Sequence, residues 1–205
     1  MTEMLTLLEG LERTAGASVE ELQALRSRFP IEWPKDYMDC LRWSNGIEGY
    51  VRGHGYLWLW STSDVARLND AYGVSELAPN LILVGSDAGP SGYGFDTTHV
   101  ALPFIRVEMA AMHREYVENI ASSFAEFVRH LAEAPLAAGE AEPGNFGPPN
   151  WLRGKILHEK HPIVMGGDPN DPDNRVLVPR DVHPQLTVFW ARAVHRIRKE
   201  KQAEG

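Results

Sequence analysis

The stretch that most constrains this fold runs from Asn80 to Asp96 and reads NLILVGSDAGPSGYGFD. Its first part, Leu81 to Val84, is an unbroken apolar run with two β-branched residues, which is typical of a strand buried on both faces. The next ten residues, Gly85 to Gly94, contain four glycines and one proline, so the chain must turn tightly there. An alternating pattern restarts at Tyr93. We therefore predict a long hairpin with Asp87 in its loop.

Amphipathic spacing and capping residues predict the helices that surround this hairpin. Ser18 and Glu21 form a capping-box pattern, and Pro34 suits the first turn of a helix, where its missing N–H group costs little. The aromatic stretch from Tyr50 to Trp60 predicts one strand, and Val100 to Val107 predicts another. The expected helices cover about residues 3–11, 18–29, 34–45, 64–72 and 122–131. These elements together indicate an α+β fold.

The last third of the chain differs in composition from the part before it. Residues 135–150 are rich in Ala, Gly, Pro and Glu, and we interpret them as a flexible linker. After them we predict short strands at Lys155–Leu157 and Arg175–Val178, followed by a helix from Asp181 to about Glu200. The expected organisation is a domain at residues 1–134, a linker at 135–150 and a small module at 151–205 that ends in a basic helix.

Charge and cysteine content restrict the function classes. The net charge is −8, made of −11 over residues 1–150 and +3 over residues 151–205. An acidic body disfavours non-specific nucleic-acid binding and favours a basic partner, although solubility alone explains it equally well. The single cysteine, Cys40, excludes an internal disulfide framework and a cysteine-based zinc site. No apolar run approaches about 18 residues and no signal peptide is evident, so we expect a cytoplasmic protein that does not bind membranes.

Three features in this order resemble the SUKH superfamily, which includes yeast cell-wall assembly regulators and many bacterial immunity proteins. They are WPKDYMDCLRWSNG at Trp33–Gly46, YLWLWS leading into a capped helix, and LILVGSDAGPSGYGFD. The resemblance covers about residues 19–131. One departure is Ala88-Gly89-Pro90, where the family usually runs through further glycines, and it leaves the shape of that loop open.

The resemblance implies a non-enzymatic α+β domain with a curved, mixed but mainly antiparallel sheet flanked by helices. Bacterial members resemble immunity proteins, which bind and neutralise a cognate toxin. The recurrent family positions correspond here to Asn45, Trp60, Gly85, Asp87 and Tyr93. We interpret most of them as structural, with Gly85 as a backbone requirement and Trp60 as a core residue. Asn45, Trp60, Asp87 and Tyr93 are nevertheless the candidate partner-binding residues, and the loop residues Asp87 and Tyr93 are the better candidates.

The tail suggests a rival function. His161, Gly166-Gly167, Asn174 and His183 echo the HNH nuclease pattern, in which one histidine activates water, another binds a metal and the asparagine orients the loop. The spacing is loose, and turn chemistry explains the same residues. We therefore expect a toxin-binding protein without catalysis, cofactor or metal. A metal-dependent nuclease and a regulatory protein-interaction scaffold are the alternatives.

Overall fold

The computed structural model describes residues 3–135 and 146–203. A seven-stranded sheet in the order β1-β2-β3-β4-β5-β6-β7 forms its centre, and all six pairings are antiparallel. The strands are β1 (Glu12–Arg13), β2 (Ile47–Tyr50), β3 (Tyr56–Leu59), β4 (Leu81–Ser86), β5 (Ser91–Asp96), β6 (Phe104–Glu108) and β7 (Val117–Ala121). This arrangement confirms the α+β class.

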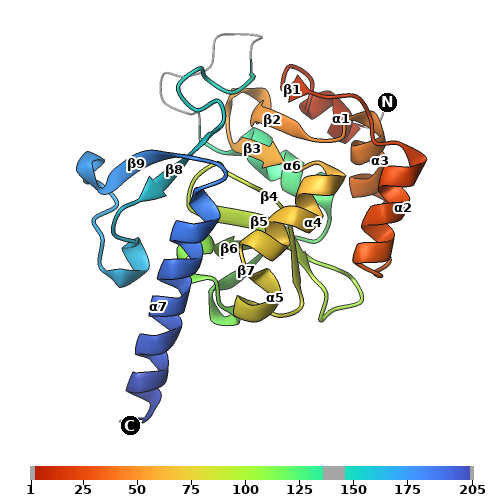
Figure 1. Cartoon of the computed structure of the whole chain (residues 1–205). Helices are drawn as coiled ribbons and strands as arrows, with labels where there is room; N and C mark the ends of the chain where they lie inside the picture. Colours follow the sequence, from red (N-terminus) through yellow and green to blue (C-terminus); the bar gives the residue numbers. More distant parts are fainter. Residues whose placement is uncertain (1–2, 136–145, 204–205) are drawn as a thin grey trace.

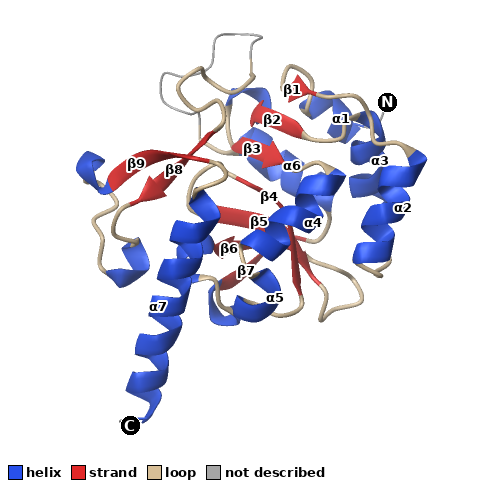
Figure 2. Cartoon of the chain, viewed as in Figure 1, coloured by secondary structure: helices blue, strands red, loops and turns tan. Residues whose placement is uncertain are grey.

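The helices pack around this sheet, as Figure 1 and Figure 2 show. They are α1 (Glu3–Leu7), α2 (Val19–Arg28), α3 (Lys35–Trp43), α4 (Thr62–Ala71), α5 (Val74–Leu77) and α6 (Phe124–Glu133). The predicted capping box at α2 is present, because Glu21 N donates to Ser18 Oγ and Ser18 N donates to Glu21 Oε2. Ser61 caps α4 and Ser123 caps α6.

The central hairpin is confirmed as β4 and β5, which lie in the middle of the sheet. Every residue of β4 is buried, which agrees with a strand covered on both faces. Gly85 and Gly94 are required for close packing of neighbouring strands. An added Cβ would lie 2.7 Å from the Trp58 carbonyl oxygen at Gly85 and 2.1 Å from the Ile82 carbonyl oxygen at Gly94. The expectation that Gly85 meets a backbone requirement therefore agrees with the packing.

Two strand expectations were wrong. The stretch from Tyr50 to Trp60 is not one strand but the end of β2, a turn and β3. Arg52 and Gly53 have φ values of 56° and 86° at that turn, a left-handed conformation that an extended strand cannot contain. The strand expected from Val100 begins only at Phe104, after a turn, and β7 was not predicted.

Aromatic side chains from the sheet and from α3 and α6 pack against one another in the core. Phe104 of β6 stacks on Phe127 of α6 with ring centroids 4.4 Å apart, and Tyr37 of α3 meets Phe95 of β5 edge to face at 5.4 Å. Helix α6 therefore packs against the sheet. Aromatic pairs of this kind add about 0.5–1.5 kcal/mol each beyond the area that they bury.

The tail forms the predicted strand-loop-strand-helix unit of β8 (Lys155–Glu159), β9 (Arg175–Pro179) and α7 (His183–Ala203). It packs on the body, because Leu157 N donates to the Ala88 carbonyl and Ile156 and Ala191 join the main core. Most of the expected linker, residues 136–145, lies outside the described residues. The division into domain, linker and module therefore stays a prediction.

Candidate functional site

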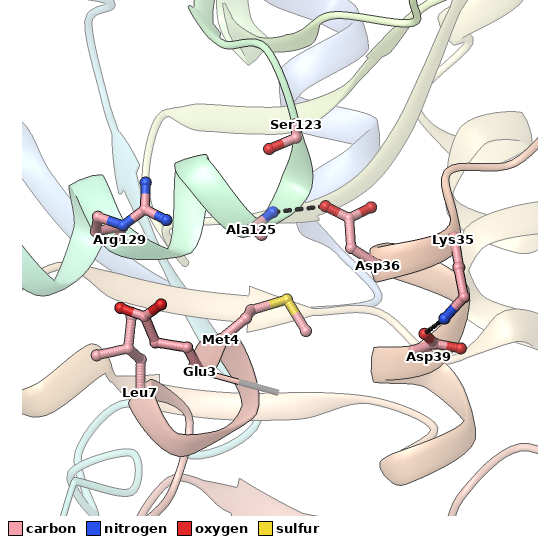
Figure 3. Close-up of a pocket in the computed structure, with 9 residues that line it drawn as sticks. All are labelled: Glu3, Met4, Leu7, Lys35, Asp36, Asp39, Ser123, Ala125 and Arg129. Atoms are coloured by element: carbon pink, nitrogen blue, oxygen red, sulfur yellow. Dashed lines mark hydrogen bonds and ion pairs between the residues drawn. The ribbon is translucent and has the colours of Figure 1, made fainter. Parts of the chain in front are cut away.

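One candidate binding surface is a groove of about 500 Å³ between α1, α3 and α6. We call it the helical groove (Figure 3). Its apolar lining comes from Met4, Leu7 and Ala125, and its charged lining adds three carboxylates and two cations. The complete lining is Glu3, Met4, Leu7, Lys35, Asp36, Asp39, Ser123, Ala125 and Arg129. An apolar floor with a charged rim is the usual composition of a protein-binding site.

Asp36 holds the two longer helices of the helical groove in place. Its Oδ2 accepts a hydrogen bond from Ala125 N at 2.8 Å, so a side chain of α3 satisfies an amide in the first turn of α6. Across α3, Lys35 and Arg42 both pair with Asp39. The hydrogen bond from Lys35 is the main reason why the pKa of Asp39 is lowered. At this groove, Lys35 and Asp39 are therefore ordered by pairing within α3, and Asp36 is ordered by its bond to α6.

Two of the predicted partner-binding residues are buried. Trp60 is fully buried and stacks on Tyr72, with ring centroids 6.0 Å apart, so it cannot touch a partner in this structure. Tyr93 is 7% exposed and packs on Phe127 at 4.8 Å. The prediction of Trp60 as a contact residue is corrected here, because core packing covers the whole side chain. The predicted role of Tyr93 as the better candidate is weakened by its burial.

The other two predicted residues are partly exposed and also organise the backbone. Asn45 Oδ1 accepts from Thr62 N at 2.8 Å, and its Nδ2 donates to Glu21 Oε1 at 3.1 Å. Asp87 Oδ1 accepts from Gly89 N at 2.9 Å and from Ser91 N at 3.0 Å, which closes the loop between β4 and β5. Burial raises the pKa of Asp87, and these two N–H groups oppose the rise. Partner binding through either residue stays a prediction.

Asn45 also lines a second groove, of about 330 Å³, that sequence reasoning missed. There the guanidinium of Arg180, from the tail, lies 3.9 Å from the centre of the Trp58 ring and pairs with Glu48. Trp58, next but one to Trp60, is thus the tryptophan that faces this groove. Side chains alternate along a strand, which predicts that Trp58 and Trp60 face one side and Leu59 the other. This pattern does not predict which of the two tryptophans lies at the surface.

The histidines of the nuclease-like pattern do not share one open site. His183 is 2% exposed, and a hydrogen bond of 2.9 Å joins its Nδ1 to the Tyr72 hydroxyl group. Burial, with a smaller effect from His158, lowers the pKa of His183 to about 3. His161 is exposed, and its ring centroid lies 6.0 Å from that of Trp190. Within residues 3–135 and 146–203, no group of three or more His, Cys, Asp or Glu side chains is arranged to hold a metal ion.

Asn174 organises the tail loop, as the nuclease-like pattern predicts for its asparagine. Its Oδ1 accepts from His161 N at 2.8 Å and its Nδ2 donates to the His161 carbonyl at 2.9 Å. Gly167 lies beside this pair, because an added Cβ would be 1.9 Å from the same carbonyl oxygen. Asn174 and Gly167 therefore build this loop together with the backbone of His161, whereas His183 is buried at the start of α7.

The junction between body and tail contains carboxylates from distant parts of the sequence, and sequence analysis did not predict that they lie close together. Burial and the charge of Glu159 raise the pKa of Glu108, at the end of β6, to about 7. The Glu159 carboxylate accepts from Ile163 N at 3.1 Å. His158 is 6% exposed and its ring lies 5.2 Å from that of His183. These groups lie where β8 packs on the loop between β4 and β5, through the hydrogen bond from Leu157 N to the Ala88 carbonyl.

The chain has an α+β fold whose main sheet is seven-stranded and antiparallel. The model of the SMI1 / KNR4 family (SUKH-1) matches residues 16–130, more than half of the 205-residue chain, and the chain belongs to this family. This match confirms the resemblance to the SUKH superfamily. A search of the curated proteins found no match. None of the helices that the structure describes is both long and apolar enough to cross a membrane.

Proposed function

We propose that the protein neutralises a cognate toxin by stoichiometric binding, without catalysis and without a cofactor. Membership in the SMI1 / KNR4 family is the observation that carries this proposal, because the SUKH superfamily includes bacterial immunity proteins. The charge of −11 over residues 1–150 supports a basic partner, since opposite charges speed association. We further propose the cytoplasm as the place of action.

The helical groove is the surface that fits this role best. It combines an apolar floor of Met4, Leu7 and Ala125 with a rim on which carboxylates outnumber cations by one. An apolar side chain of the toxin would fill the floor, and basic side chains around it would meet Glu3 and Asp36. The mechanism is occlusion: the bound protein covers the active site or substrate channel of the toxin.

Co-expression and binding experiments with the product of the neighbouring gene test this proposal. We expect growth rescue and a complex with the wild-type protein. Ala125→Trp fills the helical groove while leaving the backbone N–H that bonds to Asp36, and it should abolish binding. Ala24→Trp, on the exposed surface of α2, is the matched control and should bind normally. Binding that survives Ala125→Trp would place the interface elsewhere, and no complex at all would overturn the immunity proposal.

The nuclease alternative is less well supported than toxin binding. A metal-binding histidine needs an accessible ring nitrogen, whereas His183 is 2% exposed and bonded to Tyr72. A nuclease assay with Mg²⁺, Mn²⁺ or Zn²⁺ distinguishes the two functions. We expect no cleavage. Metal-dependent cleavage that is lost in His161→Ala, a change at an exposed side chain, would contradict the proposal of binding alone.

A further inference from the structure

An arginine side chain of the tail lies in a slot on the body whose walls come from β2 and β3. Glu48 of β2 and Trp58 of β3 are direct partners in the antiparallel pairing, and Tyr56 lies two residues before Trp58. Side chains at such positions share one face of a sheet and lie within reach of one another. The guanidinium of Arg180 lies over the Trp58 ring, 3.9 Å from its centre, and pairs with Glu48. We call the space between Glu48, Tyr56 and Trp58 the arginine slot.

The chemistry of the arginine slot suits a guanidinium group better than an ammonium group. The Tyr56 hydroxyl donates to Glu48 Oε1 at 2.6 Å, which orients the carboxylate. An indole ring offers a flat face on which a planar guanidinium stacks, and a carboxylate offers two oxygens for a forked pair of hydrogen bonds. The ammonium group of lysine has neither the plane nor the fork. The slot therefore favours arginine over lysine.

Arg180 itself uses the hydrogen-bonding capacity of the arginine slot only in part. Its Nη2 donates to Glu48 Oε1, the same oxygen that accepts from Tyr56. Its Nε is buried and has no hydrogen-bond partner among the residues that the structure describes. A buried donor without a partner costs free energy, and arginine pairs best with a carboxylate through two parallel bonds. An arginine from another chain that makes both bonds can therefore compete with Arg180.

The position of Arg180 allows such an exchange. It lies in the turn between β9 and α7, so its side chain can rotate out of the slot while both elements stay in place. The slot also opens into the second groove, of about 330 Å³, because Glu48, Trp58 and Arg180 all line that groove. A side chain from solvent can thus reach the Trp58 ring through the second groove.

The second groove is acidic apart from the arginines that the tail brings to it. The body contributes three carboxylates to its lining, among them Glu12 and Glu48, and the cation of Arg13. Two tail residues neutralise these carboxylates, since Arg180 pairs with Glu48 and Arg153 pairs with Glu12. Charge complementarity therefore favours an occupant that carries arginine, which is also the side chain that the slot already contains.

We propose that the arginine slot binds an arginine side chain of a partner protein, and that Arg180 occupies the slot until the partner displaces it. The tail thereby inhibits partner binding within the same chain. The apparent dissociation constant is the intrinsic one divided by the fraction of molecules whose slot is empty. This inference does not depend on toxin binding at the helical groove, which is built from α1, α3 and α6.

A blocked tripeptide with a central arginine between two glycines is the probe that tests the proposal. Its binding to the full chain is followed by the indole N–H resonance of Trp58 in heteronuclear NMR spectra. We expect Arg180→Ala to bind this peptide with a dissociation constant on the order of 1 mM. The wild type should bind at least about tenfold more weakly, because Arg180 competes for the slot. The same peptide with lysine in place of arginine should bind Arg180→Ala at least about fivefold more weakly.

Two further variants separate the arginine slot from non-specific binding. Adding Glu48→Gln to Arg180→Ala should weaken peptide binding by about tenfold or more, because the charged acceptor is lost. Arg192→Ala is the matched control: it removes an arginine that pairs with Glu76 on the exposed surface, and it should bind as weakly as the wild type. Circular dichroism checks the fold of each variant, and Arg180→Gln provides the same test if Arg180→Ala does not fold.

Three results would overturn the proposal. The first is an emptied slot that binds the arginine peptide no more tightly than the wild type does. The second is equal binding of the arginine and lysine peptides. The third is binding that Glu48→Gln leaves unchanged.

Discussion

Burial of His183 should make the stability of this protein depend on pH in a way that one substitution removes. His183 is 2% exposed and hydrogen-bonded to Tyr72, and burial lowers its pKa to about 3. In the unfolded chain the same imidazole has a pKa of about 6.5. Between these two values the unfolded chain binds more protons than the folded chain, so the free energy of unfolding falls as the pH falls from about 7.

The size of the effect follows from the two pKa values. At about pH 5 the unfolded histidine is almost fully protonated, whereas the folded one remains neutral. The difference amounts to about 2 kcal/mol relative to neutral pH. A loss of this size is a large part of the free energy of unfolding of most domains, which is about 5–15 kcal/mol. His183→Gln removes the titrating group and keeps a polar side chain next to the Tyr72 hydroxyl group.

Urea unfolding at about pH 7 and about pH 5 measures this effect as a double difference. The wild type should lose about 2 kcal/mol more than His183→Gln on acidification, because contributions from all other groups cancel. Tyr72→Phe is the control: it should lower stability at both pH values and keep the pH dependence, since His183 still titrates. An equal loss in wild type and His183→Gln would refute the buried, neutral state of this histidine.

Two further predictions concern polar groups inside the body. Asn69→Ala should destabilise the fold by about 2–4 kcal/mol in urea unfolding, because Asn69 bonds to the backbone of Val65 and Leu83 and its loss leaves buried groups unsatisfied. A loss below about 0.5 kcal/mol would contradict this role. The pKa of Glu108 is raised to about 7, above its unfolded value, so its ionisation disfavours the folded state at higher pH. Glu108→Gln should therefore gain about 1–3 kcal/mol relative to wild type at about pH 8 and little at about pH 5, and an equal effect at both pH values would show that Glu108 titrates normally.

Local signals in the sequence predicted the elements that depend on neighbouring residues. Ser18 and Glu21 lie three residues apart, and their reciprocal hydrogen bonds follow from that spacing. The central hairpin was predicted from an apolar run followed by glycines. The prediction of one strand from Tyr50 to Trp60 was wrong because Arg52 takes a left-handed conformation. An arginine at that position does not predict this conformation.

The candidate sites depend on contacts between distant residues, which periodicity cannot show. Tyr72 and His183 are 111 residues apart, and Asp36 and Ala125, which join two walls of the helical groove, are 89 apart. Trp60 was included among the candidate contact residues because it matches a recurrent position of the SUKH superfamily, and its interpretation as a core residue agrees with its complete burial. The burial of the loop around Asp87 follows from β8, a strand about 70 residues further along the chain, whose docking no local pattern indicates.

Titration of the toxin with this protein tests the central proposal most directly. The neighbouring gene product, assayed for its own activity, would be mixed with increasing amounts of the purified protein. Stoichiometric occlusion predicts that inhibition is complete at about one equivalent and that Ala125→Trp does not inhibit. Complete inhibition at a small fraction of an equivalent would show turnover, and it would contradict neutralisation by binding.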